Sequence, residues 1–77
     1  MKDFTRHLGD QLRALRKERG FSQEGFADHI GMHRTYYGAL ERGEKNLQLS
    51  TLHRVAAGFS VSPGELFLAA ERAAARG

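Results

Sequence analysis

The chain has no cysteine, a single proline (Pro63) and no alternating apolar pattern of the kind that predicts strands. Without cysteine, neither a disulfide nor a thiolate metal site can stabilise the fold, and the composition fits a reducing cytoplasm. A chain of 77 residues forms one domain at most, which we place at 1–77. Its core is modest, so stability must come from helix packing, within the chain or against a partner subunit.

Long hydrophobic runs are also missing. No segment approaches the roughly 20 apolar residues that a membrane span needs. Residues 1–13, MKDFTRHLGDQLR, carry charges throughout and contain no apolar run of signal-peptide length. We therefore expect a soluble, cytoplasmic protein with no membrane partner.

The usual sequence signs of catalysis and of metal binding are absent. No phosphate-binding loop of the GxxxxGK type occurs, and the serine, histidine and aspartate residues are scattered over a chain too small to shape a pocket. His29 and His33 are four residues apart, but Gly31 between them is expected to break the helix that a shared metal site needs. We expect no enzymatic activity, no cofactor and no bound metal.

The chain does have positive charge and helical periodicity. A net charge of +3 and a pI near 9.8 favour a polyanionic partner. An apolar stripe with steps of four, four and three residues predicts a helix over residues 3–18. Gly9 inside this helix costs about 1 kcal/mol relative to alanine if it is exposed. The stripe consists of Phe4, Leu8, Leu12 and Leu15.

Four more helices are expected, so the predicted fold class is an all-α, five-helix bundle. The last one begins with a strong signal, because Ser62 is a good cap, Pro63 suits the first helical position and Glu65 completes a capping box. The start of the fourth is open, since Ser50 resembles a cap while Leu49 looks buried. The predicted helices cover residues 23–30, 34–42, 49–58 and the segment from 63 onward.

Residues 22–42 are the most informative segment of the chain. Ser22 is the predicted cap of a short helix, Gly31 turns the chain, and a second short helix ends before Gly43. Two short helices around a glycine turn are typical of the DNA-binding helix-turn-helix, in which the second helix enters the major groove. The pattern predicts a protein that reads double-stranded DNA.

Within the second helix, Tyr37 and Leu40 are expected to face the core, which turns a polar face outward. Arg34 is the leading candidate for base reading, because its guanidinium can donate two parallel hydrogen bonds to guanine. Thr35 can contact a base edge or a thymine methyl group, and small residues allow close approach. The predicted base contacts are His33, Arg34, Thr35 and Ala39.

Predicted phosphate contacts flank these residues. Gln23 begins the first helix of the motif, where backbone amides and the positive helix end favour a phosphate. The hydroxyl of Tyr36 is expected to reach the DNA backbone, and the loop after the second helix can grip it. The complete predicted set is Ser22, Gln23, Tyr36, Arg42, Lys45 and Asn46.

Landmarks spread from Ser22 to Phe67 resemble the Cro/C1-type (XRE) helix-turn-helix family, which has a lambda-repressor-like fold. A finer string is similar to the controller proteins of restriction–modification systems, and it consists of His33-Arg34-Thr35-Tyr36, then Glu41-Arg42-Gly43 and Asn46-Leu47. Ser60 departs from the family, which has glycine at the end of the fourth helix. The landmarks are Ser22-Gln23-Glu24, Ala27, Gly31, Leu40-Glu41-Arg42-Gly43, Leu52, Val55-Ala56, Val61-Ser62 and Glu65-Leu66-Phe67.

The resemblance implies a transcriptional regulator that acts as a homodimer on a near-palindromic operator, with RNA polymerase as a further candidate partner. It also implies a structural ion pair between Arg16 and Glu41, which is plausible physically because a buried carboxylate is tolerated when arginine clamps it. Dimerisation also follows from geometry, since one recognition helix reads too few base pairs to find one genomic site. The candidate interface residues are Val61, Leu66 and Phe67, with the monomer core as their alternative location.

The alternative function is a protein-interaction module or an antitoxin that uses the same fold. Antitoxins add a toxin-binding segment, for which this chain has few residues to spare. A salt titration separates the two functions, because DNA binding through several phosphates weakens steeply as salt rises.

Overall fold

The computed structural model describes residues 2–76, and over that range it contains five helices and no strand. The predicted all-α, five-helix fold is confirmed, and each predicted helix boundary lies within one residue of the observed one. None of the described helices has the length and apolar character required to cross a bilayer. The helices are α1 (Lys2–Glu18), α2 (Gln23–His29), α3 (Arg34–Glu41), α4 (Leu49–Gly58) and α5 (Pro63–Arg76).

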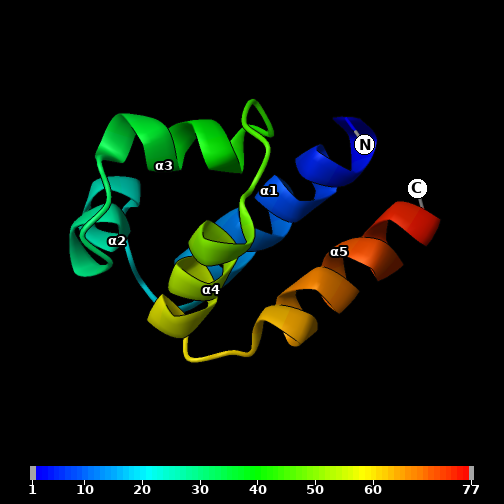
Figure 1. Cartoon of the computed structure of the whole chain (residues 1–77). Coiled ribbons are helices and arrows are strands. Elements are labelled where there is room, and N and C mark those ends of the chain that lie inside the picture. Colours follow the sequence, from blue (N-terminus) through cyan, green and yellow to red (C-terminus); the bar gives the residue numbers. More distant parts are fainter. Residues whose placement is uncertain (1, 77) are drawn as a thin grey trace.

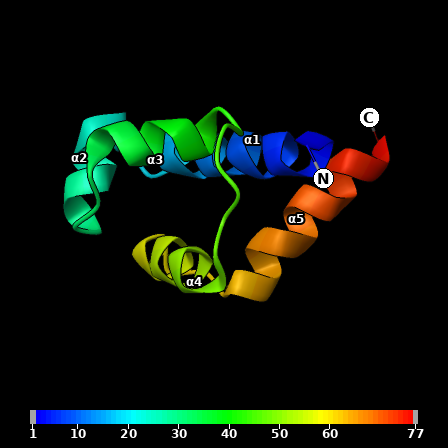
Figure 2. The same ribbon diagram turned by 45° about the horizontal axis from the view of Figure 1, so that its top comes forward.

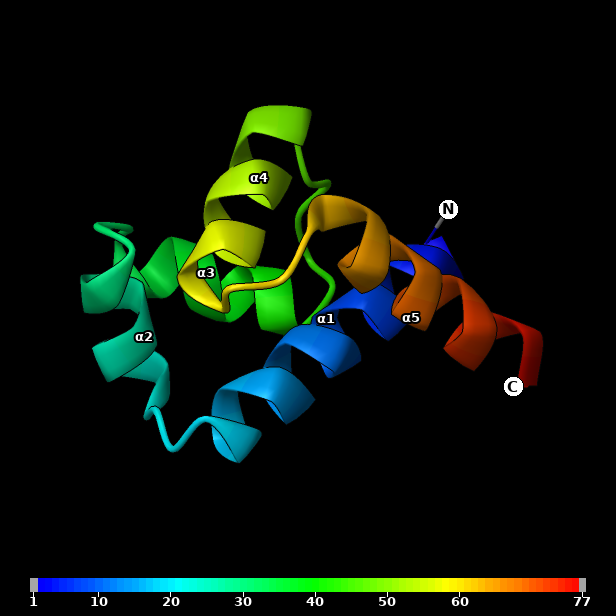
Figure 3. The ribbon, with the colours of Figure 1, turned by 90° about the horizontal axis from the view of Figure 1, so that it is seen from below.

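The longest helix, α1, is the central element of the bundle (Figure 1). It packs against α5 and against α3, which lies alongside it in Figure 2. The beginning of α1 and the end of α5 lie at one end of the molecule, and α2 lies at the other (Figures 1 and 3). Within the helix-turn-helix, α2 is therefore remote from the ends of the chain (Figure 1), whereas the turn after α3 comes close to Arg6 near the start of α1.

Aromatic packing joins the helix-turn-helix to the rest of the core. The ring of Phe26 in α2 stacks on Phe59 at the end of α4, with centroids 4.0 Å apart and planes at 7°. Phe26 also packs against Tyr37 of α3, at a centroid distance of 5.2 Å. Burial of these rings helps to fix α2 and α3 relative to α4. The rest of the core comes from Leu8, Leu12, Ala27, Met32, Leu40, Leu52, Val55, Ala56, Leu66 and Ala70.

Gly9 is buried, so the expectation that it only weakens an exposed part of the helix is wrong. A Cβ at this position would lie 2.3 Å from the backbone oxygen of Glu41 and 2.7 Å from that of Leu40. The backbones of α1 and α3 thus come into direct contact, which no residue with a side chain would permit. The glycine lowers the intrinsic stability of α1 but allows α3 to dock closely on it.

The observed helix caps match the predicted ones at two starts and settle a third that the sequence left open. The Oγ of Ser22 accepts the Gly25 amide at 2.9 Å, and Ser62 and Glu65 form a reciprocal capping box with two bonds of 3.0 Å. The open question at α4 is resolved: the helix begins at Leu49, which is 79 % exposed, and Gln48 rather than Ser50 occupies the cap position.

Candidate nucleic-acid interface

The two faces of α3 differ in burial. Tyr37 is fully buried and Leu40 is 2 % exposed, whereas Arg34 and Thr35 are exposed to solvent. Ala39 is only 6 % exposed, so its predicted place on the outer face is wrong. Its side chain is covered by surrounding residues, so we do not place it on the solvent-facing side of α3.

His33 caps the start of α3. Its Nδ1 accepts a hydrogen bond from the Thr35 amide at 3.3 Å, which satisfies one of the free N–H groups at the helix start. The side chain is exposed, so it remains at the surface where the predicted base contacts lie.

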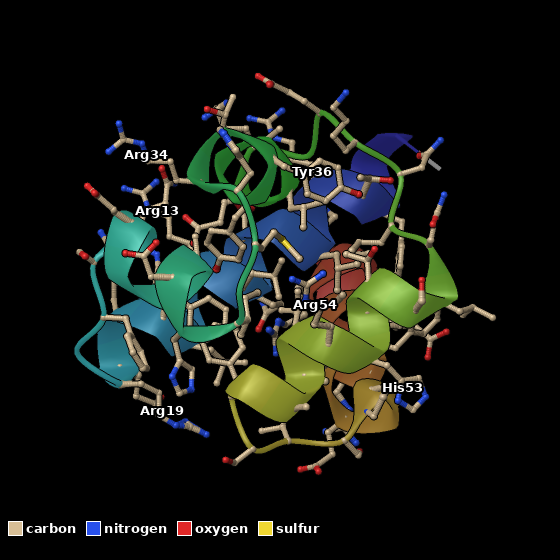
Figure 4. All side chains as sticks on the ribbon, turned by 60° about the vertical axis from the view of Figure 1, so that its left-hand side comes forward. Arg13, Arg19, Arg34, Tyr36, His53 and Arg54 are labelled. Carbon is tan, nitrogen blue, oxygen red and sulfur yellow. The ribbon has the colours of Figure 1, made fainter. Side chains whose placement is uncertain are left out.

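Arg34 projects from the first turn of α3, and Figure 4 shows Arg34 and Arg13 extending from the same side of the molecule. The Nη1 of Arg34 lies 3.0 Å from Oε1 of Glu24 in the first turn of α2. Both side chains of this pair are more than three-fifths exposed, at 64 % and 62 %. The guanidinium is therefore accessible while one of its edges faces a carboxylate.

Arg16 and Glu41 form a bidentate ion pair between α1 and the end of α3. Arg16 Nε donates to Glu41 Oε2 at 2.6 Å, and Arg16 Nη2 donates to Glu41 Oε1 at 3.1 Å. The third nitrogen, Nη1, donates to the backbone oxygen of Phe21 at 2.9 Å. One side chain thereby fixes the end of α3, and the segment before α2, to α1.

Charge pairing controls ionisation at this site. Burial acts to raise the pKa of Glu41, but hydrogen bonds from Arg16 and Gln23 outweigh it and hold the pKa below its ordinary value. The hydrogen bond with Glu41 raises the pKa of Arg16. Burial, together with the nearby Glu41 carboxylate, raises the pKa of Tyr37, whose hydroxyl forms no hydrogen bond of normal geometry within residues 2–76. All three groups therefore keep their ordinary charge states near neutral pH.

A polar hollow opens beside this ion pair, where α1, α2 and α3 meet. Gln23 reaches into it and donates from Nε2 to Glu41 Oε1 at 3.2 Å, while Ser22 before it is exposed. Arg13 also lines the hollow, and the sequence interpretation missed it. Its position three residues before Arg16 on one helix was the available signal, since such residues share a face. The lining residues are Arg13, Arg16, Gln23, Glu41 and Arg42.

The loop after α3 carries a second group of polar side chains. Arg42 Nε donates to Glu44 Oε2 at 3.0 Å in an exposed pair, and Lys45 and Asn46 are exposed beside it. Gly43 has a φ of +71°, and a Cβ there would lie 2.8 Å from the Cα of Arg6. A glycine is thus needed both for the turn and for the contact with α1. Arg6, another basic residue that the sequence interpretation missed, lines the same hollow as this loop.

The turn between α2 and α3 is held by a residue from α4. Arg54 donates from Nε to the backbone oxygen of Ile30 at 2.9 Å, and from Nη2 to that of Gly31. These oxygens are free acceptors at the end of α2, so Arg54 satisfies them and restrains the turn. Figure 4 shows Arg54 on the side of α4 that faces this turn. Tyr36, also labelled there, lies across α3 from Arg34 and is half-buried against the core.

A separate apolar surface lies where α4 and α5 meet. It includes three large exposed side chains, which are Leu49 (79 % exposed), Phe67 (44 %) and Leu68 (43 %). The ring of Phe67 packs against that of Phe4, with the ring centroids 4.7 Å apart. We call Leu49, Leu52, Phe67 and Leu68 the α4–α5 patch, because these residues line two adjoining hollows. Of the predicted interface residues, Phe67 lies in this patch and Val61 is half-buried elsewhere. Leu66 is 1 % exposed and belongs to the monomer core, which corrects its placement at an interface.

Comparison with known proteins gives consistent matches. The sequence pattern of the helix-turn-helix family HTH_3 matches residues 12–66. The chain is 41 % identical over 68 residues to control protein C.MunI of a Mycoplasma species, covering 87 % of this chain and 92 % of that one. It is 39 % identical over 64 residues to control protein C.SmaI of Serratia marcescens, covering 83 % and 76 % of the two chains.

A solved structure shares the fold as well. The restriction-modification controller protein C.AhdI from Aeromonas hydrophila superposes with a TM-score of 0.77 at 36 % identity. The match covers 86 % of this chain and 98 % of that one. The similarity thus spans all of the helix-turn-helix together with most of the surrounding bundle.

Proposed function

The chain belongs to the HTH_3 (Cro/C1-type) helix-turn-helix family of DNA-binding transcription regulators, and we propose that it acts as a homodimer on a near-palindromic operator of a restriction–modification system. One observation carries the proposal: α3 buries Tyr37 and Leu40 while Arg34 and Thr35 of its first turn face solvent. This is the orientation that a recognition helix needs, with its N-terminal residues free to meet base edges. The role is non-enzymatic and needs no cofactor, and a DNA ligand implies work in the cytoplasm.

Arg34 is the proposed base reader. Its guanidinium is 64 % exposed, and it can donate two parallel hydrogen bonds to O6 and N7 of guanine. Thr35 next to it and His33 at the cap are proposed as secondary base contacts. Ala39 is excluded from this set by its burial.

The phosphate contacts are proposed on both sides of α3. On one side, Gln23 lines the polar hollow and Ser22 precedes it at the surface, and we add Arg13, which lines the same hollow, as a further cation. On the other side, Arg42, Lys45 and Asn46 belong to the exposed loop after α3. Tyr36 is the proposed contact on its own flank of α3. Such contacts set the register of the protein on DNA without reading sequence.

A second copy is the proposed occupant of the α4–α5 patch. Two recognition helices about 34 Å apart are needed to read successive major grooves on one face of DNA. Leu49 protrudes beside a hollow lined by Leu52, Pro63 and Phe67, so a two-fold arrangement lets each Leu49 enter the partner's hollow. RNA polymerase remains a candidate partner once the dimer is bound near a promoter.

Selection of bound sequences from random duplex DNA tests the proposal. We expect two inverted half-sites, and the absence of enrichment would contradict sequence reading. On the selected operator, Arg34→Ala should reduce the affinity ratio between operator and scrambled DNA by about tenfold. Lys45→Ala is the matched control, since loss of a phosphate contact weakens both DNAs equally. Equal losses for Arg34→Ala would move Arg34 to the phosphate contacts.

A further inference from the structure

The ion pair between Arg34 and Glu24 joins the proposed base reader to the neighbouring helix. Arg34 Nη1 and Glu24 Oε1 are 3.0 Å apart, and both side chains are largely exposed. Exposed pairs contribute little to folding, so the main consequence of this pair has to be sought in binding. A guanidinium has five N–H donors, and a bidentate contact to guanine uses two, so Arg34 can keep Glu24 while it reads a base.

A carboxylate beside Arg34 affects its two possible DNA partners differently. A phosphate is an anion, so it has to displace Glu24 or approach against its charge in order to take the guanidinium. Guanine O6 and N7 are neutral acceptors, and they can receive the remaining donors of Arg34 without contact with Glu24. We propose that Glu24 is a specificity-determining residue, which keeps Arg34 off phosphates and thereby favours guanine. The inference rests on the proposed function, since it assumes that Arg34 faces DNA.

The chain contains a second exposed pair that serves as a matched comparison. Arg42 and Glu44 are joined at 3.0 Å in the loop after α3, where the proposed contacts are phosphates only. Glu44 therefore competes with the backbone of every DNA sequence equally. Removing its charge should strengthen binding to operator and to scrambled DNA alike, whereas removing that of Glu24 should strengthen binding to scrambled DNA preferentially.

The test measures affinities of Glu24→Gln and Glu44→Gln for the selected operator and for scrambled DNA, by fluorescence anisotropy over a range of salt concentrations. For Glu24→Gln we expect the operator-to-scrambled affinity ratio to fall by about three- to fivefold. The salt slope on scrambled DNA should steepen by about 0.9, because Arg34 gains a phosphate contact. Glu44→Gln should leave the ratio unchanged. Glu18→Gln, which makes the same change in net charge at the end of α1, is the control for global charge.

A double-variant cycle separates this effect from a general structural one. If Glu24 acts through Arg34, then Glu24→Gln should leave the ratio unaltered once Arg34→Ala is present. An unchanged or higher ratio for Glu24→Gln alone would overturn the inference, and so would an equal fall in both backgrounds. Failure of the wild-type chain to select any sequence would instead contradict the proposed function itself, so the two failures are distinguishable.

Discussion

The two ends of this small bundle use side chains in opposite ways. At the helix-turn-helix end, polar groups are tied to one another: Arg16 holds Glu41, Gln23 joins them, and Arg54 binds the turn before α3. At the α4–α5 patch, Leu49, Phe67 and Leu68 face solvent with large exposed areas. Directional bonds fix the orientation of α3 within one chain, whereas exposed apolar area provides a surface that a second chain can cover.

This difference has a consequence for the effects of substitution. At the helix-turn-helix end, a substitution in the Arg16–Glu41 pair should first lower the stability of the monomer, because this pair is buried. At the α4–α5 patch, a substitution should first weaken self-association of the chain, because the side chains there are exposed. The following substitutions test the contrast.

Glu41→Ala is expected to have the largest effect, a loss of about 3 kcal/mol in the free energy of unfolding. It leaves Arg16 without its carboxylate, and the side chains of this pair are only 10 % and 3 % exposed. Denaturant unfolding followed by circular dichroism measures the loss. Glu44→Ala, which removes the carboxylate of an exposed pair, should leave the midpoint unchanged. A small effect of Glu41→Ala would mean that the pair does not hold α3 to α1.

Acid should weaken the same ion pair between Arg16 and Glu41. The folded pKa of Glu41 lies below its ordinary value of 4.5, so the ion pair contributes its full stability above that value. The contribution is lost as pH falls through the folded pKa, because the folded state then has to protonate the carboxylate. Unfolding measured from pH 7 down to pH 2 should show a decrease below 4.5 that is smaller in Glu41→Ala. Parallel curves for the two proteins would assign the acid sensitivity to other carboxylates.

Gly9→Ala should cost about 2 kcal/mol of stability, although alanine is the better helix former. The added Cβ would lie 2.3 Å from the backbone oxygen of Glu41 in α3. A backbone atom cannot move out of the way as the end of a flexible side chain can. Gly64→Ala is the control, because a Cβ added there would lie 3.8 Å from Ser62 Oγ, at ordinary contact distance. It should be neutral or stabilising. Equal responses at the two positions would show that α3 can move off α1 freely.

Gly9 also illustrates what the sequence could and could not predict. Helix number and limits follow from local signals, such as apolar spacing and the Ser62–Glu65 capping box, which depend on neighbours in sequence. The closeness of α1 and α3 depends on residues some thirty positions apart, and no local signal encodes it. From the sequence alone, Gly9 was therefore expected only to weaken its helix, because its contact with the α3 backbone was not known.

The burial of Ala39 and the exposure of Leu49 also depend on residues distant in sequence, so neither was predicted from the sequence. Tyr37 and Leu40 were predicted correctly as inward, but Ala39, which was predicted to face outward, is also buried. Leu49 looked buried because it is apolar, yet it begins α4 and is 79 % exposed among residues 2–76. The positions of the proposed DNA contacts followed from the motif, whereas Arg13 and Arg54 act from α1 and α4 and were not predicted.

Ser60→Gly should stabilise the chain by about 0.5–1 kcal/mol. Ser60 joins α4 to α5 with a φ of +59°, a left-handed conformation in which a Cβ is strained and glycine is not. The gain is limited because glycine also increases the entropy of the unfolded chain. Thermal unfolding measures it, with Ser62→Gly as the control that removes the α5 cap and should be destabilising. A loss of stability in Ser60→Gly would mean that this turn is held by more than its backbone.

Leu49→Asp should have the smallest effect on folding and so gives the sharpest contrast with Glu41. Leu49 is 79 % exposed and is the first residue of α4, where a carboxylate interacts favourably with the helix end, so monomer stability should change by less than about 0.5 kcal/mol. A charge in the patch should nevertheless weaken self-association about tenfold or more. Ser50→Asp adds the same charge one residue away and lines neither hollow, so in sedimentation velocity it should associate like the wild type. If both variants remain associated, the patch is not the dimer interface, and the exposed leucine has to be explained by another occupant.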